Sequence, residues 1–259
     1  IIVAIGAKNN DGVNGVSSGH VRVHEWNGTS WVQRGDDING EAEGDESGFS
    51  VSLSNDGSIV AIGARRNNGV NVLEYHGRAY SGSQDETLSK NQYSLTAALQ
   101  YLKDNEQYKG MHYSTTSQGY YFYKSEAIMG DTVDNYSNFI LHVKRSGENS
   151  GHVRVYEWNG SAWVLRGDDI DGEAAGDESG ISVSLSSDGS IVAIGARRNN
   201  GVNGTNSGHV RVYEWNGSSW VQLGEDIDGE AEGDESALSI SLSSDGNIVA
   251  IGARYNSGV

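Results

Sequence analysis

Three acidic segments of nearly identical sequence are the first candidates for chemistry in this chain. They are "GDDINGEAEGDES" (35–47), "GDDIDGEAAGDES" (167–179) and "GEDIDGEAEGDES" (224–236), each with six or seven carboxylates. Hard oxygen ligands at alternating positions, as in Asp169, Asp171 and Glu173, suit Ca²⁺. A solvated acidic connector that binds no ion is the alternative. The candidate calcium ligands are Asp37, Asn39, Glu41, Asp45, Asp169, Asp171, Glu173, Asp177, Asp226, Asp228, Glu230 and Asp234.

No strong catalytic signature accompanies these segments. His20, His152 and His209 each precede "VRV" and recur with the surrounding sequence, which favours a structural role, because a catalytic residue rarely needs a copy in every repeat. The remaining histidines show no metal-like spacing. The glycine-rich stretch "GVNGTNSG" lacks the lysine of a phosphate-binding loop. The sequence therefore predicts a protein that is not an enzyme.

The elements that position these residues repeat with a fixed period. The motif "VAIGA" begins at Val3, Val60, Val192 and Val249. Its first and last intervals are 57 residues, and the middle one is 132, which is one period plus 75. The extra residues fall between Gly69 and Gly151. The chain begins and stops inside this pattern, so we expect a piece of a longer repetitive protein.

Each period predicts four antiparallel strands and no helix. In the cleanest copy the first two strands are "ISVSLS" (181–186) and "SIVAIGA" (190–196), joined by an Asp-Gly turn. The third strand has the sequence "GHVRVYEW" and the fourth a sequence like "AWVLRG", joined by an Asn-Gly turn. The fold class is therefore all-β, with β-propeller-like four-stranded blades. Two tryptophans flank each Asn-Gly turn, and we expect them to pack across the hairpin or against the next blade; a stacking surface for sugars is the alternative. The pairs are Trp26 and Trp31, Trp158 and Trp163, and Trp215 and Trp220.

The segment "GDESGISVSLSSDGSIVAIGA" resembles the FG-GAP repeat, the blade of integrin-α-like propellers. "GDESGFSVSLSNDG" shows the same pattern with the Phe displaced by one place. The resemblance implies extracellular or cell-surface proteins that bind partners or build adhesive structures, often with calcium in the blade loops. Here the acidic residues lie between blades rather than inside a hairpin. "LSSDGSIVAIGA" is also similar to WD-repeat hairpins, so the propeller class is the firmer part of this expectation.

The 75 additional residues predict a separate domain spliced into a blade loop. We expect blades at 1–71, an inserted α+β domain at 72–145 and further blades at 146–259. "SLTAALQYLKDNEQ" (94–107) has a Ser cap and one apolar face, which predicts a helix. The order "AALQYLKDNEQYKGMHYS" then "GYYFYKS" is similar to apple/PAN modules, without their cysteines. Such modules bind protein or carbohydrate, and a small sheet core is the alternative role for the candidate ligand residues Tyr113, Tyr121 and Tyr123.

Composition narrows the class of protein. The net charge of −17 argues against binding nucleic acid or an anionic membrane. The absence of Cys excludes disulfides and thiolate metal sites, and no apolar stretch is long enough to span a bilayer. Five Asn-x-Ser/Thr sequons are candidates for glycosylation on a secreted chain, although Asn-Gly-Ser is also good turn chemistry. They are Asn27, Asn135, Asn159, Asn203 and Asn216.

These features predict an extracellular structural or adhesive repeat protein, a repeating subunit of a glycosylated surface appendage or filament. Its partners would be copies or neighbouring repeats of itself, because unpaired strand edges template pairing with another chain. Glycans or cell-surface proteins are further candidate partners. One alternative is a monomeric, lectin-like or receptor-type binding module of a larger adhesin. Another is an enzyme with its site at the centre of a propeller.

Overall fold

The computed structural model describes residues 1–68, 70–76, 86–89, 110–114, 119–123, 139–145 and 148–258. The chain divides into two compact parts. One comprises Ile1–Gly69 with Ser146–Val259, and the other comprises Val70–Arg145. All elements among the described residues are β-strands, which confirms the all-β class.

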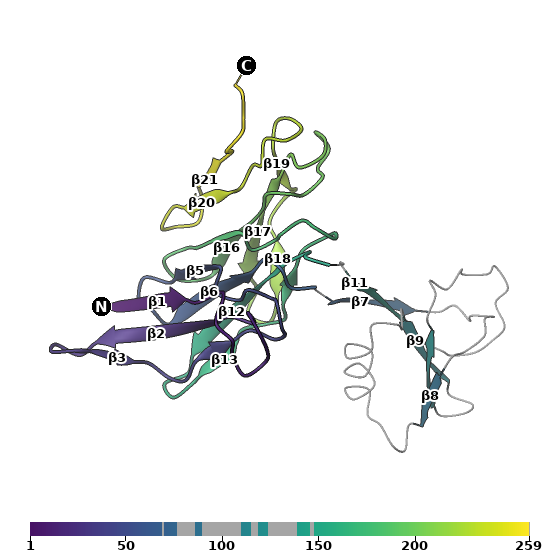
Figure 1. The fold of residues 1–259 in the computed structure, drawn as a ribbon, viewed down its shortest axis with the longest axis horizontal. Coiled ribbons are helices and arrows are strands. Elements are labelled where there is room, and N and C mark those ends of the chain that lie inside the picture. Colours follow the sequence, from purple (N-terminus) through teal and green to yellow (C-terminus); the bar gives the residue numbers. More distant parts are fainter. Residues whose placement is uncertain are drawn as a thin grey trace. The chain divides into compact units, whose positions relative to one another are not determined.

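The part that comprises Ile1–Gly69 and Ser146–Val259 contains four antiparallel sheets that follow one another along the chain (Figure 1). Each of these sheets, together with its loops, is called a unit below. The second sheet has the order β5-β6-β12-β13, and β14 pairs with β12. The third sheet repeats this order with β15-β16-β17-β18, and β19 pairs with β17. The bounds are β5 Ser50–Leu53, β6 Ile59–Ala64, β12 His152–Trp158, β13 Trp163–Leu165, β14 Ile170–Asp171, β15 Ser182–Leu185, β16 Ile191–Ala196, β17 His209–Trp215, β18 Trp220–Gln222 and β19 Ile227–Asp228.

The first and last sheets contain parts of the same pattern. The first has the order β1-β2-β3, with β4 on β2, and the last pairs only β20 and β21. The strands β1, β6, β16 and β21 all carry the "VAIG" motif and so occupy the same place in the repeat. Among the described residues the four sheets do not close into a barrel or a propeller. The bounds are β1 Ile2–Gly6, β2 His20–Trp26, β3 Trp31–Gln33, β4 Ile38–Asn39, β20 Ser239–Leu242 and β21 Val249–Gly252.

The inserted segment lies between two neighbouring strands of the second sheet. β6 and β12 pair antiparallel, with Ala64 opposite His152, although the insertion separates them along the chain (Figure 1). The insertion forms its own antiparallel sheet in the order β7-β11-β9-β10-β8. Its strands are β7 Val70–His76, β8 Glu86–Ser89, β9 Gly110–Ser114, β10 Gly119–Tyr123 and β11 Phe139–Arg145. The helix expected at 94–107 lies outside the described residues, so an α+β class for this segment is not supported.

Local turn chemistry explains the hairpins of the repeat. Asp188 Oδ1 accepts hydrogen bonds from the Ser186 hydroxyl at 2.7 Å and from the Ser190 N–H at 3.0 Å. These donors lower the pKa of Asp188 to about 2, because they stabilise its charged form. Gly189 follows with a φ of +69°, a conformation that favours glycine. The chain therefore reverses here and brings β15 against β16.

Apolar side chains on both faces of the sheets form the core between consecutive units. Val60, Val192 and Val210 are completely buried. The first strands of consecutive sheets lie against each other, with β15 contacting both β5 and β20. The first strand of each sheet also contacts the "VAIG" strand of the sheet before it, as β5 contacts β1 and β15 contacts β6. The same hydrogen bond joins them twice, from the Leu185 N–H to Ser52 Oγ and from the Leu242 N–H to Ser184 Oγ, both at 3.0 Å. Stacking therefore repeats with the sequence.

No helix long and apolar enough to cross a membrane occurs in the described part of the chain.

Candidate functional site

Short strands carry the acidic segments to the start of the third strand of each sheet. β14 pairs with the beginning of β12, with Asp171 opposite His152, and β19 pairs with β17 in the same way. Asp169 lies just before β14, and its Oδ1 accepts a hydrogen bond from Arg154 Nε at 2.9 Å. In the first unit, Arg22 donates to both oxygens of Asp37 at 2.9 Å. That hydrogen bonding lowers the pKa of Asp37 to about 2.

The last aspartate of each acidic segment fastens its own loop. Asp177 Oδ2 accepts from the Ala174 N–H at 3.0 Å and from Asn199 Nδ2 at 2.9 Å. Burial raises the pKa of Asp177 above its ordinary value, since desolvation penalises the carboxylate. Asp45 and Asp234 are also buried and make the same two contacts in their own units. These three carboxylates are already engaged by protein donors.

One of the four candidate calcium ligands in each segment is thus already held by protein donors. Calcium takes six to eight oxygen ligands, and a carboxylate that accepts hydrogen bonds from Arg, Asn or backbone N–H groups has fewer lone pairs left to offer. In the described part of the chain, the groups of close ligand atoms combine one carboxylate from each of two successive segments with a histidine. Calcium binding by the residues of a single acidic segment stays a prediction.

Histidines complete these groups, a feature that sequence reasoning missed. His152, Asp169 and Glu41 place one ligand atom each within 4.8 Å of one another. His152 Nδ1 lies 3.7 Å from Glu41 Oε2 and 3.8 Å from Asp169 Oδ2. Arg154 holds the other oxygens of the same carboxylates, at 3.0 Å from Glu41 Oε1 and 2.9 Å from Asp169 Oδ1. Burial lowers the pKa of His152 to about 4, so its imidazole is neutral at pH 7.

The next unit repeats the group with the corresponding residues. His209 Nδ1 lies 3.4 Å from Asp226 Oδ2 and 3.9 Å from Glu173 Oε2. Burial, assisted by the charge of Arg211, lowers the pKa of His209 to about 4. Recurrence of the histidine and both acidic residues in the same phase was the available sequence signal. That recurrence favoured a structural role, because a catalytic residue rarely needs a copy in every repeat. Nothing in the sequence indicated that the glutamate of each group comes from the preceding unit.

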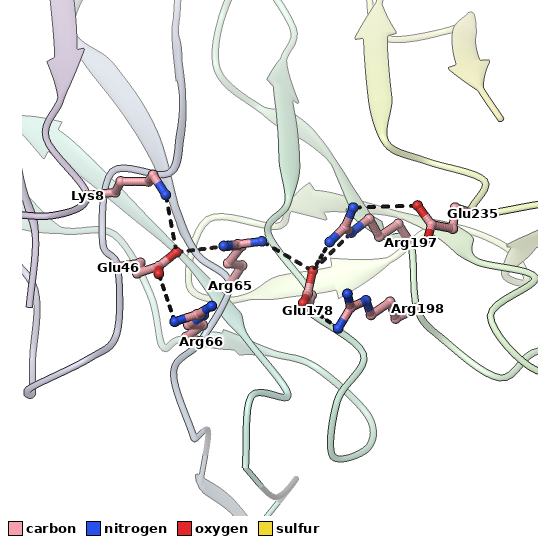
Figure 2. Close-up of polar contacts among 8 residues, drawn as sticks. All are labelled: Lys8, Glu46, Arg65, Arg66, Glu178, Arg197, Arg198 and Glu235. Atoms are coloured by element: carbon pink, nitrogen blue, oxygen red, sulfur yellow. Dashed lines mark hydrogen bonds and ion pairs between the residues drawn. The ribbon is translucent and has the colours of Figure 1, made fainter. Parts of the chain in front are cut away.

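A ladder of alternating charges joins three units (Figure 2). Arg65 Nε lies 2.9 Å from Glu46 Oε2, and its Nη1 lies 3.5 Å from Glu178 Oε2. Arg197 continues the ladder, at 2.9 Å from Glu178 and 3.5 Å from Glu235. Each glutamate has a positive φ (55°, 56° and 47°), which is uncommon for residues with a side chain. The ladder therefore holds the loops of successive units in one defined arrangement.

Three further cationic contacts extend the ladder to the solvent. Lys8 lies 3.7 Å from Glu46, Arg66 lies 3.1 Å from the same carboxylate, and Arg198 lies 3.0 Å from Glu178. Figure 2 shows these side chains on either side of the central row. Glu46 and Glu178 are buried, whereas Arg66 and Arg198 are exposed. Within the ladder, Glu46 and Glu178 are thus the most buried charged side chains.

Glycines allow the backbones of successive units to touch. A Cβ added to Gly63, in the "IGA" of one unit, would overlap the carbonyl oxygen of Gly180, which precedes β15 of the next. Gly6 has the same relation to Gly48. Gly6 and Gly63 belong to the "IGA" of the strand. Their partners Gly48 and Gly180 directly precede Phe49 and Ile181. The two halves of the motif therefore meet across the junction between units.

Residues 170–213 match the FG-GAP repeat. The match runs from β14 into β17 and so contains the Gly180 and "IGA" halves of the motif together. FG-GAP repeats are typical of extracellular or surface proteins and are generally not enzymatic. No curated protein matches the chain.

The tryptophans that flank the Asn-Gly turns pack as expected. The rings of Trp158 and Trp163 are 5.4 Å apart across their turn, tilted by 56°. Trp163 Nε1 donates to the carbonyl of Arg34 in the preceding unit at 2.8 Å, and the Arg34 guanidinium lies over Trp158. Trp220 makes the same bond to Arg166. The indoles therefore contact the preceding unit as well as each other, which confirms their packing role.

Other predicted site residues remain predictions. Asn27, Asn159 and Asn216 lie in exposed hairpin turns, where each Oδ1 accepts the N–H two residues later. Asn203 is exposed and donates to the Gly229 carbonyl at 2.7 Å. Asn135 lies outside the described residues. Tyr113 lies in β9, and Tyr121 and Tyr123 lie in the paired strand β10, but their side chains are outside what the structure describes.

Proposed function

We propose that this chain is an extracellular structural or adhesive repeat protein, a repeating subunit of a surface appendage or filament. The observation that carries the proposal is the identity of successive junctions between units. The Trp–carbonyl bond, the Arg–Glu ladder and the glycine contact all recur from one unit to the next. In arrays of this kind each repeat contacts only its neighbours, so growth by further units is open-ended.

Open sheet edges give the array a means of continuing. β6 and β16 pair on both sides within their sheets, whereas β1 pairs only with β2 and β21 only with β20 among the described residues. An unpaired edge is a template for another strand. We propose that strands of other copies of the chain pair with β1 and β21 at these edges. Stacking through the first strands supports a propeller-like relation between blades.

Negative-stain electron microscopy of the purified chain tests assembly. We expect ordered filaments or arrays, and we expect Ile5→Lys, which places a charge on the open strand β1 where Ile5 is 52% exposed, to abolish them. Val202→Lys is the matched control, because Val202 is 87% exposed but lies outside any strand. Discrete monomers of the unmodified chain at every concentration would contradict the proposal and favour the monomeric binding module.

Glycans on the exposed turns would be detected by mass spectrometry of native material.

Calcium, in this proposal, binds weakly to the exposed carboxylates of the acidic segments, since the buried ones are held by protein donors. A site half filled at the calcium concentration used contributes about 0.4 kcal/mol. We therefore expect added calcium to raise the melting temperature of the metal-free chain by only about 1–2 °C. Differential scanning calorimetry with and without calcium measures this shift. A much larger increase would show a fixed structural calcium ion instead.

A further inference from the structure

We propose that the two groups of histidine and carboxylates between units each bind a divalent transition-metal ion, with Zn²⁺ as the representative ligand. The first group is Glu41, His152 and Asp169, and the second is Glu173, His209 and Asp226. In each, the glutamate belongs to one acidic segment, whereas the histidine and aspartate belong to the following unit. A bound ion would therefore connect two units.

The imidazoles are the observation that points to a ligand. His152 and His209 are 2% and 1% exposed, and the Nδ1 atom of each is buried without a hydrogen-bond partner. Leaving a buried polar atom unsatisfied is unfavourable, and here it happens at the same position twice. Both Nδ1 atoms are directed at carboxylate oxygens.

The distances suit a shared ion better than direct contact. The separations between Nδ1 and the carboxylate oxygens are 3.4–3.9 Å, beyond the range of a good N–H···O bond. Two ligand atoms at about 2.0 Å from a tetrahedral zinc ion lie about 3.3 Å apart. Contraction by a few tenths of an ångström would bring each Nδ1 and its carboxylate oxygens to this spacing. The two carboxylate oxygens lie within 4.8 Å of each other, so they would close by up to about 1.5 Å. A fourth position would remain for water.

The donor set selects the class of metal. One neutral imidazole with two carboxylates suits zinc and related transition metals, whereas calcium and magnesium take oxygen ligands. Arg154 contacts Glu41 Oε1 and Asp169 Oδ1, whereas Glu41 Oε2 and Asp169 Oδ2 are the oxygens that lie 3.7 and 3.8 Å from His152 Nδ1. Hydrogen bonds to the distal oxygens orient ligating carboxylates, which is a common arrangement around metal ions.

The second site has equivalent support. Gln222 donates to Asp226 Oδ1 at 2.7 Å, and Arg211 lies 3.5 Å from Glu173 Oε1. Asn199 makes only a long 3.5 Å contact with Glu173 Oε2, the oxygen that faces His209. In the first unit His20 and Asp37 lie 3.9 Å apart, but no glutamate joins them among the described residues. The described part of the chain therefore contains two such groups.

Zinc titration of the metal-free full chain by isothermal titration calorimetry at pH 7 tests the proposal. We expect two tight sites per chain, one in Glu41→Gln, and none in the Glu41→Gln/Glu173→Gln double variant. Both glutamates are partly exposed, at 38% and 47% of the side chain, so these variants should fold, as circular dichroism would verify. Glu230→Gln is the matched control, because Glu230 holds the same place in the third acidic segment but joins no histidine group among the residues that the structure describes.

Cobalt substitution gives a second reading of the same sites. Co²⁺ bound by nitrogen and oxygen in a tetrahedral site absorbs visible light, and this absorption should halve in Glu41→Gln and disappear in the double variant. Excess calcium should not displace the cobalt. The proposal is overturned if zinc fails to bind, or if it binds equally well to the double variant, which would locate it on other histidines or on surface carboxylates.

Discussion

Replacing Glu178 by glutamine is expected to lower the free energy of unfolding by about 3 kcal/mol, the lower end of the range for breaking a buried ion pair. Glu178 is the central anion of the ladder, with Arg65 on one side and Arg197 on the other. The neutral amide keeps the shape of the side chain but leaves both guanidinium groups, each 13% exposed, without their shared counter-charge. Urea unfolding followed by tryptophan fluorescence measures the loss, because the indoles lie between units.

Glu235→Gln is the control for this result. Glu235 lies at the end of the ladder, contacts Arg197 only at 3.5 Å, and is 19% exposed. Its replacement should cost less than about 1 kcal/mol, as for partly solvated pairs. Equal effects of the two substitutions would show that the ladder is not cooperative. A negligible effect of Glu178→Gln would show that water screens the central glutamate.

Gly63→Ala should also lower the free energy of unfolding by about 3 kcal/mol, the upper end for an added methyl group in a well-packed interior. The new Cβ would overlap the carbonyl oxygen of Gly180, and backbone in two packed sheets has little room to move. The substitution therefore separates successive units rather than disturbing one strand. Urea unfolding gives the magnitude, and size-exclusion chromatography reports expansion of the folded chain.

Gly252→Ala separates this effect from the general cost of a methyl group. Gly252 is the corresponding residue of the last "IGA", and its added Cβ would approach Ser239 Oγ, much as that of Gly63 would approach Ser50 Oγ. No backbone of a following unit lies against Gly252 among the described residues. Since a serine side chain can rotate and alanine restricts the unfolded chain, we expect a change within about 1 kcal/mol. A large loss at Gly252 would assign the cost to the serine instead.

Much of the architecture was predictable because its causes are local. The period between Val3 and Val60, the alternation of "HVRV" and the Asn-Gly and Asp-Gly turns predict strands from neighbouring residues alone. The same regularity predicted the pairing of strands on either side of the insertion. The packing of the tryptophan pairs followed as well, since the turn of each hairpin brings both indoles together.

The partners of the charged residues were decided by the tertiary structure. The acidic segments predicted four ligands within one segment. In the structure, Asp177 accepts a hydrogen bond from Asn199, and Glu41 lies 3.7 Å from His152 of the next unit. These pairings depend on how one sheet stacks on another, a spacing that no local pattern contains. By itself the sequence determined the repeat, its strands and the place of the insertion, because turns and alternation act between near neighbours. Only stacking of the sheets brought Arg65 to Glu178 and a buried histidine to two carboxylates, because those contacts join residues of different repeats.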